Sequence, residues 1–110
     1  MAKYAQWTTL TASPGQRDEL AGRALEMAGL ARSAPGCETF AVCISPSEPT
    51  VVWLFELFET RQSHDALAAL EQTLEIAGRT MTLLAGRSAR TARMRMLPPA
   101  PGRAGWSATA

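Results

Sequence analysis

The sequence predicts an α+β fold in which one antiparallel sheet carries two helices on one of its faces. Segments rich in β-branched, aromatic or alternating apolar residues predict four strands, at residues 4–11, 38–45, 51–59 and 90–97. Apolar residues at helical spacing predict two helices, one between the first two strands and one between the last two. The resulting order, β-α-β-β-α-β, is that of the ferredoxin-like arrangement.

The first helix is predicted to begin at Ser13 and to end near residue 33. Ser13 is a preferred capping residue, Pro14 suits the first helical position, and Gln16 completes a capping box. Pro35 follows the helix and prevents its continuation. The apolar stripe of this helix consists of Leu20, Ala24, Met27, Ala28 and Ala31.

The third strand and the helix after it carry the most informative residues. From residue 51 to 58 the strand is apolar except for Glu56, which predicts burial on both faces of the sheet. Thr60 is placed to cap the second helix, and Gly78 is expected to bend or interrupt it. Two helices on one face leave the other face of the sheet apolar and uncovered, so we expect a second copy of the chain to cover it.

Composition indicates one small soluble domain. The chain has 110 residues, 46% hydrophobic and 19% charged, and its net charge of +1 does not favour nucleic acid or a membrane. Residues 1–97 are predicted to form the domain and residues 98–110, rich in proline and glycine, a tail. Cys37 and Cys43 are expected on one strand and one face, too far apart for a disulfide. Free thiols favour a cytoplasmic protein.

His64, the only histidine, is the main candidate for acid–base chemistry. Its spacing from Leu67 predicts that it points toward the sheet, although a surface histidine beside an ordinary core strand remains an alternative. One histidine and two cysteines of one strand do not make a four-ligand zinc site. A hydrolytic triad is disfavoured because His64 and Asp65 are adjacent on a helix. RNA binding is disfavoured because the third strand carries no Lys or Arg.

Short motifs within residues 4–97 resemble the antibiotic-biosynthesis monooxygenase family, whose members are dimeric α+β barrels. The motifs are T-A-S-P-G-Q at 11–16, A-P-G-C at 34–37, F-E-L-F-E-T at 55–60 with H-D at 64–65, and G-R-T-M-T-L-L-A-G at 78–86. The resemblance implies a homodimer that oxygenates a quinol or other aromatic polyketide intermediate in antibiotic biosynthesis with molecular oxygen. It implies no metal and no tightly bound cofactor.

The resemblance also implies which positions form the site. The family's tryptophan at the end of the third strand corresponds to Phe58, and a polar residue four earlier corresponds to Leu54. A family tyrosine corresponds to His64, a histidine of related members to Leu67, and an arginine of the second helix to Arg79. The loss of two donors disfavours anthrone oxidation and haem degradation. It favours Baeyer–Villiger-like ring cleavage of the angucycline type, in which reduced flavin (FADH2 or FMNH2) is a co-substrate.

These positions give a site hypothesis with two alternatives. His64 exchanges a phenolic proton, Arg79 stabilises the developing oxyanion, and Glu56 either orients His64 or is salt-bridged in the core. The alternatives are a non-catalytic dimer that carries an aromatic metabolite, and a polyketide cyclase or isomerase that needs no oxygen. The predicted substrate-binding residues are Leu54, Phe58, Met27, Leu67 and Met81, with Trp7 and Phe40 as further candidates.

Overall fold

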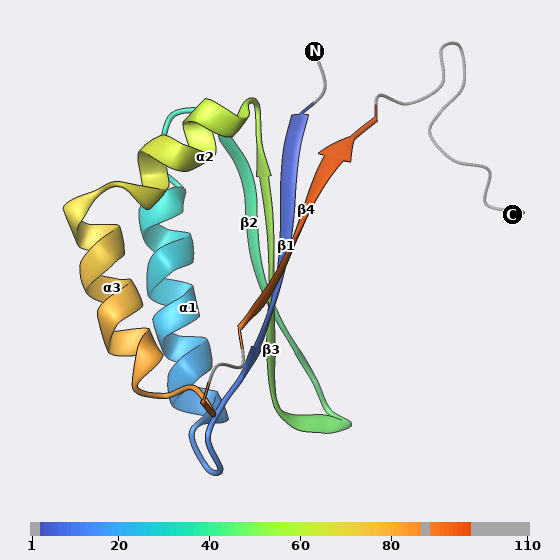
Figure 1. Ribbon diagram of the computed structural model, residues 1–110, viewed down its shortest axis with the longest axis vertical. Coiled ribbons are helices and arrows are strands. Elements are labelled where there is room, and N and C mark those ends of the chain that lie inside the picture. The colour runs from blue at the N-terminus through green and yellow to red at the C-terminus, as the bar shows by residue number, and fades with distance from the viewer. Residues whose placement is uncertain (1–2, 87–88, 98–110) are drawn as a thin grey trace, which may run out of the picture.

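The computed structural model describes residues 3–86 and 89–97 (Figure 1). The strands of this part form one antiparallel sheet in the order β2-β3-β1-β4, with the helices on one of its faces. This confirms the predicted ferredoxin-like α+β fold. Residues 98–110, predicted as a tail, lie outside the described residues. The elements are β1 (Lys3–Thr11), α1 (Arg17–Ala31), β2 (Cys37–Ser45), β3 (Glu48–Phe58), α2 (Arg61–Ala68), α3 (Glu71–Met81) and β4 (Arg90–Met96).

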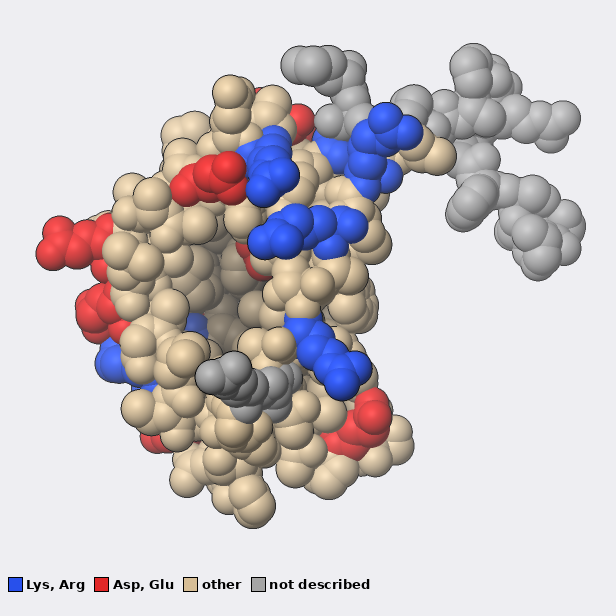
Figure 2. Space-filling view, in the orientation of Figure 1, with Lys and Arg blue, Asp and Glu red and all other residues tan. Residues whose placement is uncertain are grey.

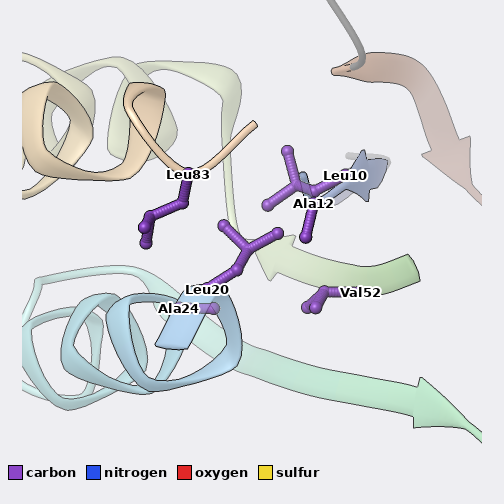
Figure 3. Packing of buried hydrophobic residues seen from close by; sticks show 6 residues of the cluster. All are labelled: Leu10, Ala12, Leu20, Ala24, Val52 and Leu83. Carbon is purple, nitrogen blue, oxygen red and sulfur yellow. The ribbon is translucent and has the colours of Figure 1, made fainter. Parts of the chain in front are cut away.

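The core lies between α1 and the middle of the sheet. Leu20 of α1 and Val52 of β3 are fully buried at its centre, and the 82–86 segment adds Leu83 (Figure 3). A second, smaller cluster at the other end of α1 joins Ala31 to Phe58 and to Leu67 of α2. None of the helices within the described ranges is long and apolar enough to cross a membrane.

The first helix begins later than the sequence predicts. Residues 13–16 form a turn in which the Gln16 N–H donates to the Ser13 carbonyl at 3.0 Å, and Gly15 adopts a positive φ of 78°. The Ser13 hydroxyl donates to the carbonyl of Leu84 at 3.1 Å and so does not cap the helix. The predicted capping box is therefore wrong, because Ser13 bonds to a distant segment and Arg17 starts α1.

The second predicted helix is two helices, α2 and α3. Thr60 caps α2 as expected, since its hydroxyl accepts a backbone N–H at 3.0 Å. The predicted interruption at Gly78 is wrong, because Gly78 lies inside α3. The break falls at Leu70, whose backbone is extended (φ −64°, ψ 142°). The Thr73 hydroxyl stabilises the junction by donating to the Leu67 carbonyl at 2.7 Å.

The two cysteines are free, as predicted, but they lie on opposite faces of the sheet. An irregularity in the register between Cys37 and Thr39 shifts the alternation of β2. Cys37 therefore packs beside Phe58 under the helices, whereas Cys43 pairs with Trp53 on the uncovered face. A bulge changes which face a residue occupies, and strand periodicity does not reveal it.

The helices leave one strand, β4, uncovered even on their own side of the sheet. Helix α1 packs on β2 and β3, α2 packs on β1 and β3, and α3 packs against α1. Strand β4 adds to the sheet through β1 alone, and all seven of its residues are exposed. The helix-side face is therefore covered over β2, β3 and much of β1 and is open along β4, and this opening determines where a ligand can enter.

We expect Leu20→Ala to lower the free energy of unfolding by about 2–5 kcal/mol, because Leu20 is fully buried and truncation leaves a cavity. Leu25→Ala is the matched control, since Leu25 lies on the same helix and is 60% exposed. Urea denaturation followed by circular dichroism measures both changes. Equal destabilisation of the two variants would contradict the placement of the core.

Candidate functional site

A cavity of about 200 Å³ lies between the sheet and the helices, and all three helices contribute to its wall. The space-filling view shows a hollow between the helices and the β4 edge, with Asp or Glu atoms inside it (Figure 2). Six of the predicted site residues line the cavity, namely Met27, Phe40, Leu54, Glu56, His64 and Leu67. The other residues of its wall are Gln6, Ala68, Thr73 and Ala77.

The floor of the cavity is one row of side chains across the sheet. Register pairs Phe40 of β2 with Glu56 of β3, and Glu56 with Gln6 of β1. Directly paired residues of antiparallel strands point to the same face. Alternation along β3 adds Leu54 to this face two residues away, while Met27 of α1 lies opposite. The row therefore offers an apolar end and a polar end to a ligand.

His64 is held in the first turn of α2 by two aromatic rings. Its ring centroid lies 5.0 Å from that of Tyr4 and 5.3 Å from that of Phe58, the latter in an edge-on geometry. The side chain is only 16% exposed. Such contacts restrict the rotation of the imidazole, so that the ring is positioned before a ligand arrives.

Asp65 fixes one nitrogen of His64. The Nδ1 atom of His64 lies 2.9 Å from Oδ1 of Asp65. Because a carboxylate only accepts hydrogen bonds, this contact favours the tautomer in which Nδ1 carries the proton and Nε2 is the acceptor. The sequence argument that adjacent helical residues do not meet is wrong here, because both side chains bend along the helix surface. The pair has the arrangement of a general base and its orienting acid.

Glu56 is buried on the cavity floor, 7% exposed, and takes part in a hydrogen-bonded chain. Gln6 Nε2 donates to Glu56 Oε2 at 3.2 Å, and the Tyr4 hydroxyl donates to Gln6 Oε1 at 2.9 Å. Burial raises the pKa of the Glu56 carboxyl, while the charge of His64 and the bond from Gln6 oppose the rise. Within the described residues Glu56 acts on His64 through charge and makes no hydrogen bond to it.

Three predicted wall residues lie outside the cavity. Phe58 is fully buried beside it and contacts His64. Trp7 lies on the opposite face of the sheet, where its ring centroid is 5.9 Å from that of Phe55. Met81 is 68% exposed at the end of α3. Helical spacing predicted that Met81 lies on the apolar stripe of one continuous helix. Because the helix breaks at Leu70, that stripe does not continue in the same direction.

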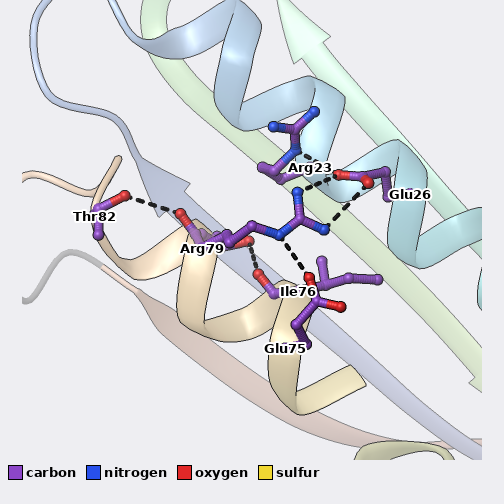
Figure 4. Close-up of polar contacts among 7 residues, drawn as sticks. Arg23, Glu26, Glu75, Ile76, Arg79 and Thr82 are labelled. Atoms are coloured by element: carbon purple, nitrogen blue, oxygen red, sulfur yellow. Dashed lines mark hydrogen bonds and ion pairs between the residues drawn. The ribbon is translucent and has the colours of Figure 1, made fainter. Parts of the chain in front are cut away.

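Arg79 is also outside the cavity, because it joins α3 to α1. Its Nε donates to Glu75 at 2.9 Å, and its two terminal nitrogens bond Glu26 of α1 at 3.3 and 3.4 Å (Figure 4). Glu26 also pairs with Arg23. Arg79 is engaged by two carboxylates in this geometry and does not reach the cavity, so the oxyanion role expected from the family position has no support from its contacts.

Sequence reasoning missed the polar residues that surround His64 and Glu56. Tyr4 and Gln6 lie on β1, an even number of residues from Leu10, which is buried under the helices. This even spacing was a signal that they share the face of Leu10. Asp65 was excluded by its adjacency to His64. Thr73 carried no signal, because it faces the cavity only through the break between α2 and α3.

We expect the free energy of unfolding of Glu56→Gln to increase, relative to that of the natural chain, as the pH rises. The raised pKa means that the folded protein favours the neutral carboxyl, so the stability associated with it is present at low pH and lost as the pH rises through the folded pKa. Unfolding in urea at pH 5 and pH 7.5 measures the difference. Glu48→Gln, at the exposed start of β3, is the control. A stability difference independent of pH would contradict this account.

Comparison with known proteins supports the assignment of the fold. The structure is similar to a provisionally named antibiotic biosynthesis monooxygenase from Chloroflexus aurantiacus, with 25% identity, a TM-score of 0.78, and coverage of 89% of this chain and 96% of that chain. It is also similar in fold to Rv0793 from Mycobacterium tuberculosis (20% identity, TM-score 0.79, coverage 89% and 98%) and to PA3566 from Pseudomonas aeruginosa (15%, 0.79, 89% and 97%).

Sequence comparison gives the family directly. None of the curated protein sequences matches the chain significantly. The sequence profile of the family described as antibiotic biosynthesis monooxygenase matches residues 4–78, which is more than half of the chain and includes β1, both cavity-lining strands that follow, α2 and most of α3. The chain therefore belongs to the antibiotic biosynthesis monooxygenase family.

Proposed function

We propose that the protein is an oxygenase that acts on a flat phenolic or quinol substrate, such as an aromatic polyketide intermediate of antibiotic biosynthesis. The observation that carries the proposal is the His64–Asp65 pair at the wall of an apolar cavity, in a chain of this family. Met27, Leu54 and Leu67 supply apolar surface on both sides of the cavity. A cavity with a few polar groups suits an aromatic ring with one or two oxygen substituents.

Proton transfer is the step that these residues perform. The Nε2 atom of His64 accepts the phenolic proton, and the imidazolium that forms is stabilised by Asp65 at Nδ1. The buried carboxyl of Glu56 adds negative charge when it is ionised and stabilises the same imidazolium through the cavity. The phenolate left in the cavity is electron-rich, which makes its ring carbon reactive toward molecular oxygen.

The oxidation balances without an external reductant where the reacting ring carbon bears one hydrogen, because the phenolic hydroxyl supplies the second. Carbon and oxygen form a hydroperoxide as the phenolate gives up an electron pair. Loss of water then breaks the O–O bond and leaves a carbonyl. One oxygen atom enters the product, the other leaves as water with two hydrogens of the substrate, and the substrate supplies all four electrons. His64 returns its proton to the leaving oxygen.

Reduced flavin (FADH2 or FMNH2) would supply the two electrons that ring cleavage takes in addition. The cavity of about 200 Å³ is smaller than the roughly 300–1,000 Å³ of pockets that enclose a drug-sized ligand. It does not enclose a flavin ring and an aromatic substrate together, so no step above passes through flavin. Ring cleavage and oxidation without flavin are distinguished by the assay below.

A carrier of an aromatic metabolite is the second candidate. The family's tryptophan and asparagine are replaced by Phe58 and Leu54, and both replacements are apolar residues at the cavity or beside it. Loss of these donors favours binding without chemistry. A cyclase or isomerase that uses His64 alone is a third form of the same site, and its turnover would continue without oxygen.

We also propose that the protein is a homodimer joined through the uncovered face of the sheet. This face presents Trp7 between Phe55 and Ala92, its partners in register, and Met94 of β4 pairs with Ala5 on the same face. Trp53 and Leu57 extend it along β3. A continuous aromatic face of this kind is costly to leave in water and is typical of a surface that another chain covers.

We expect His64→Ala to reduce oxygen uptake with hydroquinone substrates by about 10²–10⁴-fold, the usual contribution of a general base. The measurement is oxygen consumption with a panel of polyketide hydroquinones, each with and without reduced flavin. Asp65→Asn should cause a smaller loss, because it changes the tautomer and leaves the imidazole. Gln62→Ala, exposed on the same helix, is the control and should retain full activity.

Each outcome of this assay selects one function. Uptake without flavin that His64→Ala abolishes supports oxidation without a cofactor. Uptake only with flavin, giving a ring-opened product, supports ring cleavage. Binding of the hydroquinones without enzyme-dependent uptake in any condition rejects the oxygenase and leaves the carrier or the cyclase.

We expect Phe55→Arg to weaken dimerisation by at least tenfold, because it puts a charge in the centre of the apolar face. Sedimentation equilibrium measures the mass, which should fall from that of two chains to that of one at micromolar concentration. Gln62→Arg makes the same change of charge on the helix side and should leave the mass of the dimer unchanged. A natural chain that is monomeric at all concentrations would reject the homodimer.

A further inference from the structure

Two arginines of β4 point to the side of the sheet that holds the cavity. Register pairs Arg93 with Gln6 and Arg95 with Tyr4, and paired residues share a face. Gln6 lines the cavity and Tyr4 contacts His64, so both arginines follow directly along the rows of side chains that form the site. Arg90, by contrast, pairs with Thr9 and lies on the opposite face.

Neither arginine has an acidic partner among residues 3–86 and 89–97. The ion pairs of the described residues involve Lys3, Arg17, Arg23, Arg61, His64 and Arg79, and all residues of β4 are exposed. Charged side chains are common on edge strands, where they prevent association. Arg93 and Arg95 also lie on the cavity side of β4, where Lys and Arg atoms border the hollow (Figure 2), so preventing association does not by itself explain their position.

The size of the cavity directs a ligand toward Arg93. Its volume of about 200 Å³ is less than that of the pockets that enclose a drug-sized ligand, which are roughly 300–1,000 Å³. A ligand of several rings therefore extends beyond it. The helices pack against β1, β2 and β3 and leave β4 exposed, so the extension passes Gln6 of β1 toward β4. Strand spacing places Arg93 about 5 Å beyond Gln6 and about 10 Å beyond Glu56.

Charge along this row is polarised. Glu56, an acid, lies on the cavity floor in the inner half of the row, between Phe40 and Gln6, and Arg93 lies at the open end of the same row. An anionic group on the ligand is repelled from the inner end and attracted to the outer one. The guanidinium group binds carboxylate and phosphate oxygens through two parallel hydrogen bonds, which also fixes the orientation of the bound group.

We propose that Arg93, with Arg95 beside it, binds a carboxylate or phosphate carried by an aromatic ligand whose ring occupies the cavity. The inference rests on the proposed function only in using the same cavity, and it needs no oxidation step. A carboxylate belongs to an aromatic acid, and a phosphate to a flavin mononucleotide whose ring enters the cavity. Both sources present the same oxygen atoms to the arginines.

The test compares two pairs of ligands that differ only in the anionic group. The first pair is 3-hydroxy-2-naphthoate and 2-naphthol, and the second is FMN and riboflavin. Equilibrium dissociation constants are measured by fluorescence titration at low and at 0.5 M salt. We expect the anionic member of at least one pair to bind about tenfold more tightly at low salt, and the preference to decrease in high salt. The pair that shows the preference identifies the source of the anion.

Variants then show which residues cause the preference for the anionic ligand. Arg93→Gln should remove it while leaving the affinity for the neutral ligand unchanged, and Arg93→Lys should retain part of it. Arg90→Gln removes the same charge from the other face of β4 and should have no effect. Met27→Trp, which fills the cavity, should abolish binding of both members of a pair.

The inference is overturned if Arg93→Gln and Arg90→Gln behave alike, or if neither pair shows a preference for the anion. It is also overturned if Met27→Trp leaves the preference intact, because the ring would then bind elsewhere. Failure of the oxygenase is a separate result, since a charge preference that depends on Arg93 is measured without oxygen. Oxygen uptake on neutral hydroquinones together with no charge preference would reject this inference alone.

Discussion

The register between β1 and β3 is the constraint on which the site depends. It pairs Gln6 with Glu56 and Tyr4 with Phe58, and it sends all four side chains to the face that the helices cover. A slip of one residue would move this set to the opposite face and bring Trp7 and Phe55 under the helices. The hydrophobic pattern resists such a slip, because Leu10 and Val52 of the same two strands are buried against α1.

Burial of Glu56 lowers the stability of the fold locally, and the neighbouring polar residues offset part of that loss. A carboxyl group on the floor of an apolar cavity loses hydration, and the raised pKa expresses that loss. Gln6 returns one hydrogen bond, and Tyr4 holds the Gln6 amide in the orientation that donates it. A residue that destabilises the fold and is nevertheless supported by two hydrogen-bonding neighbours is more readily explained by function than by packing.

The architecture could be predicted from the sequence to a greater extent than the site. Strand alternation and helical spacing are local signals, so the order of elements and the cap at Thr60 followed from them. The break at Leu70 depends on Thr73 bonding back to Leu67, a contact between two helices that has no periodic signature. Arg79, carried over from the family, and Met81, placed by helical spacing, both lie beyond that break and fall outside the cavity.

The helices cover only part of one face of the sheet, so two surfaces remain open: the helix side of β4 and the whole opposite face. Helix α3 packs against α1, and the helix side of β4 is left free, while the opposite face is apolar across three strands. A second chain on the apolar face would stiffen β4 from behind, because Met94 and Ala92 would be covered while Arg93 and Arg95 would still face the cavity mouth. Alternation along a single edge strand thus separates the two roles, with one set of side chains for association and the other for a charged ligand. Dimerisation would then hold the arginines in place, so loss of the dimer should weaken the preference for an anionic ligand.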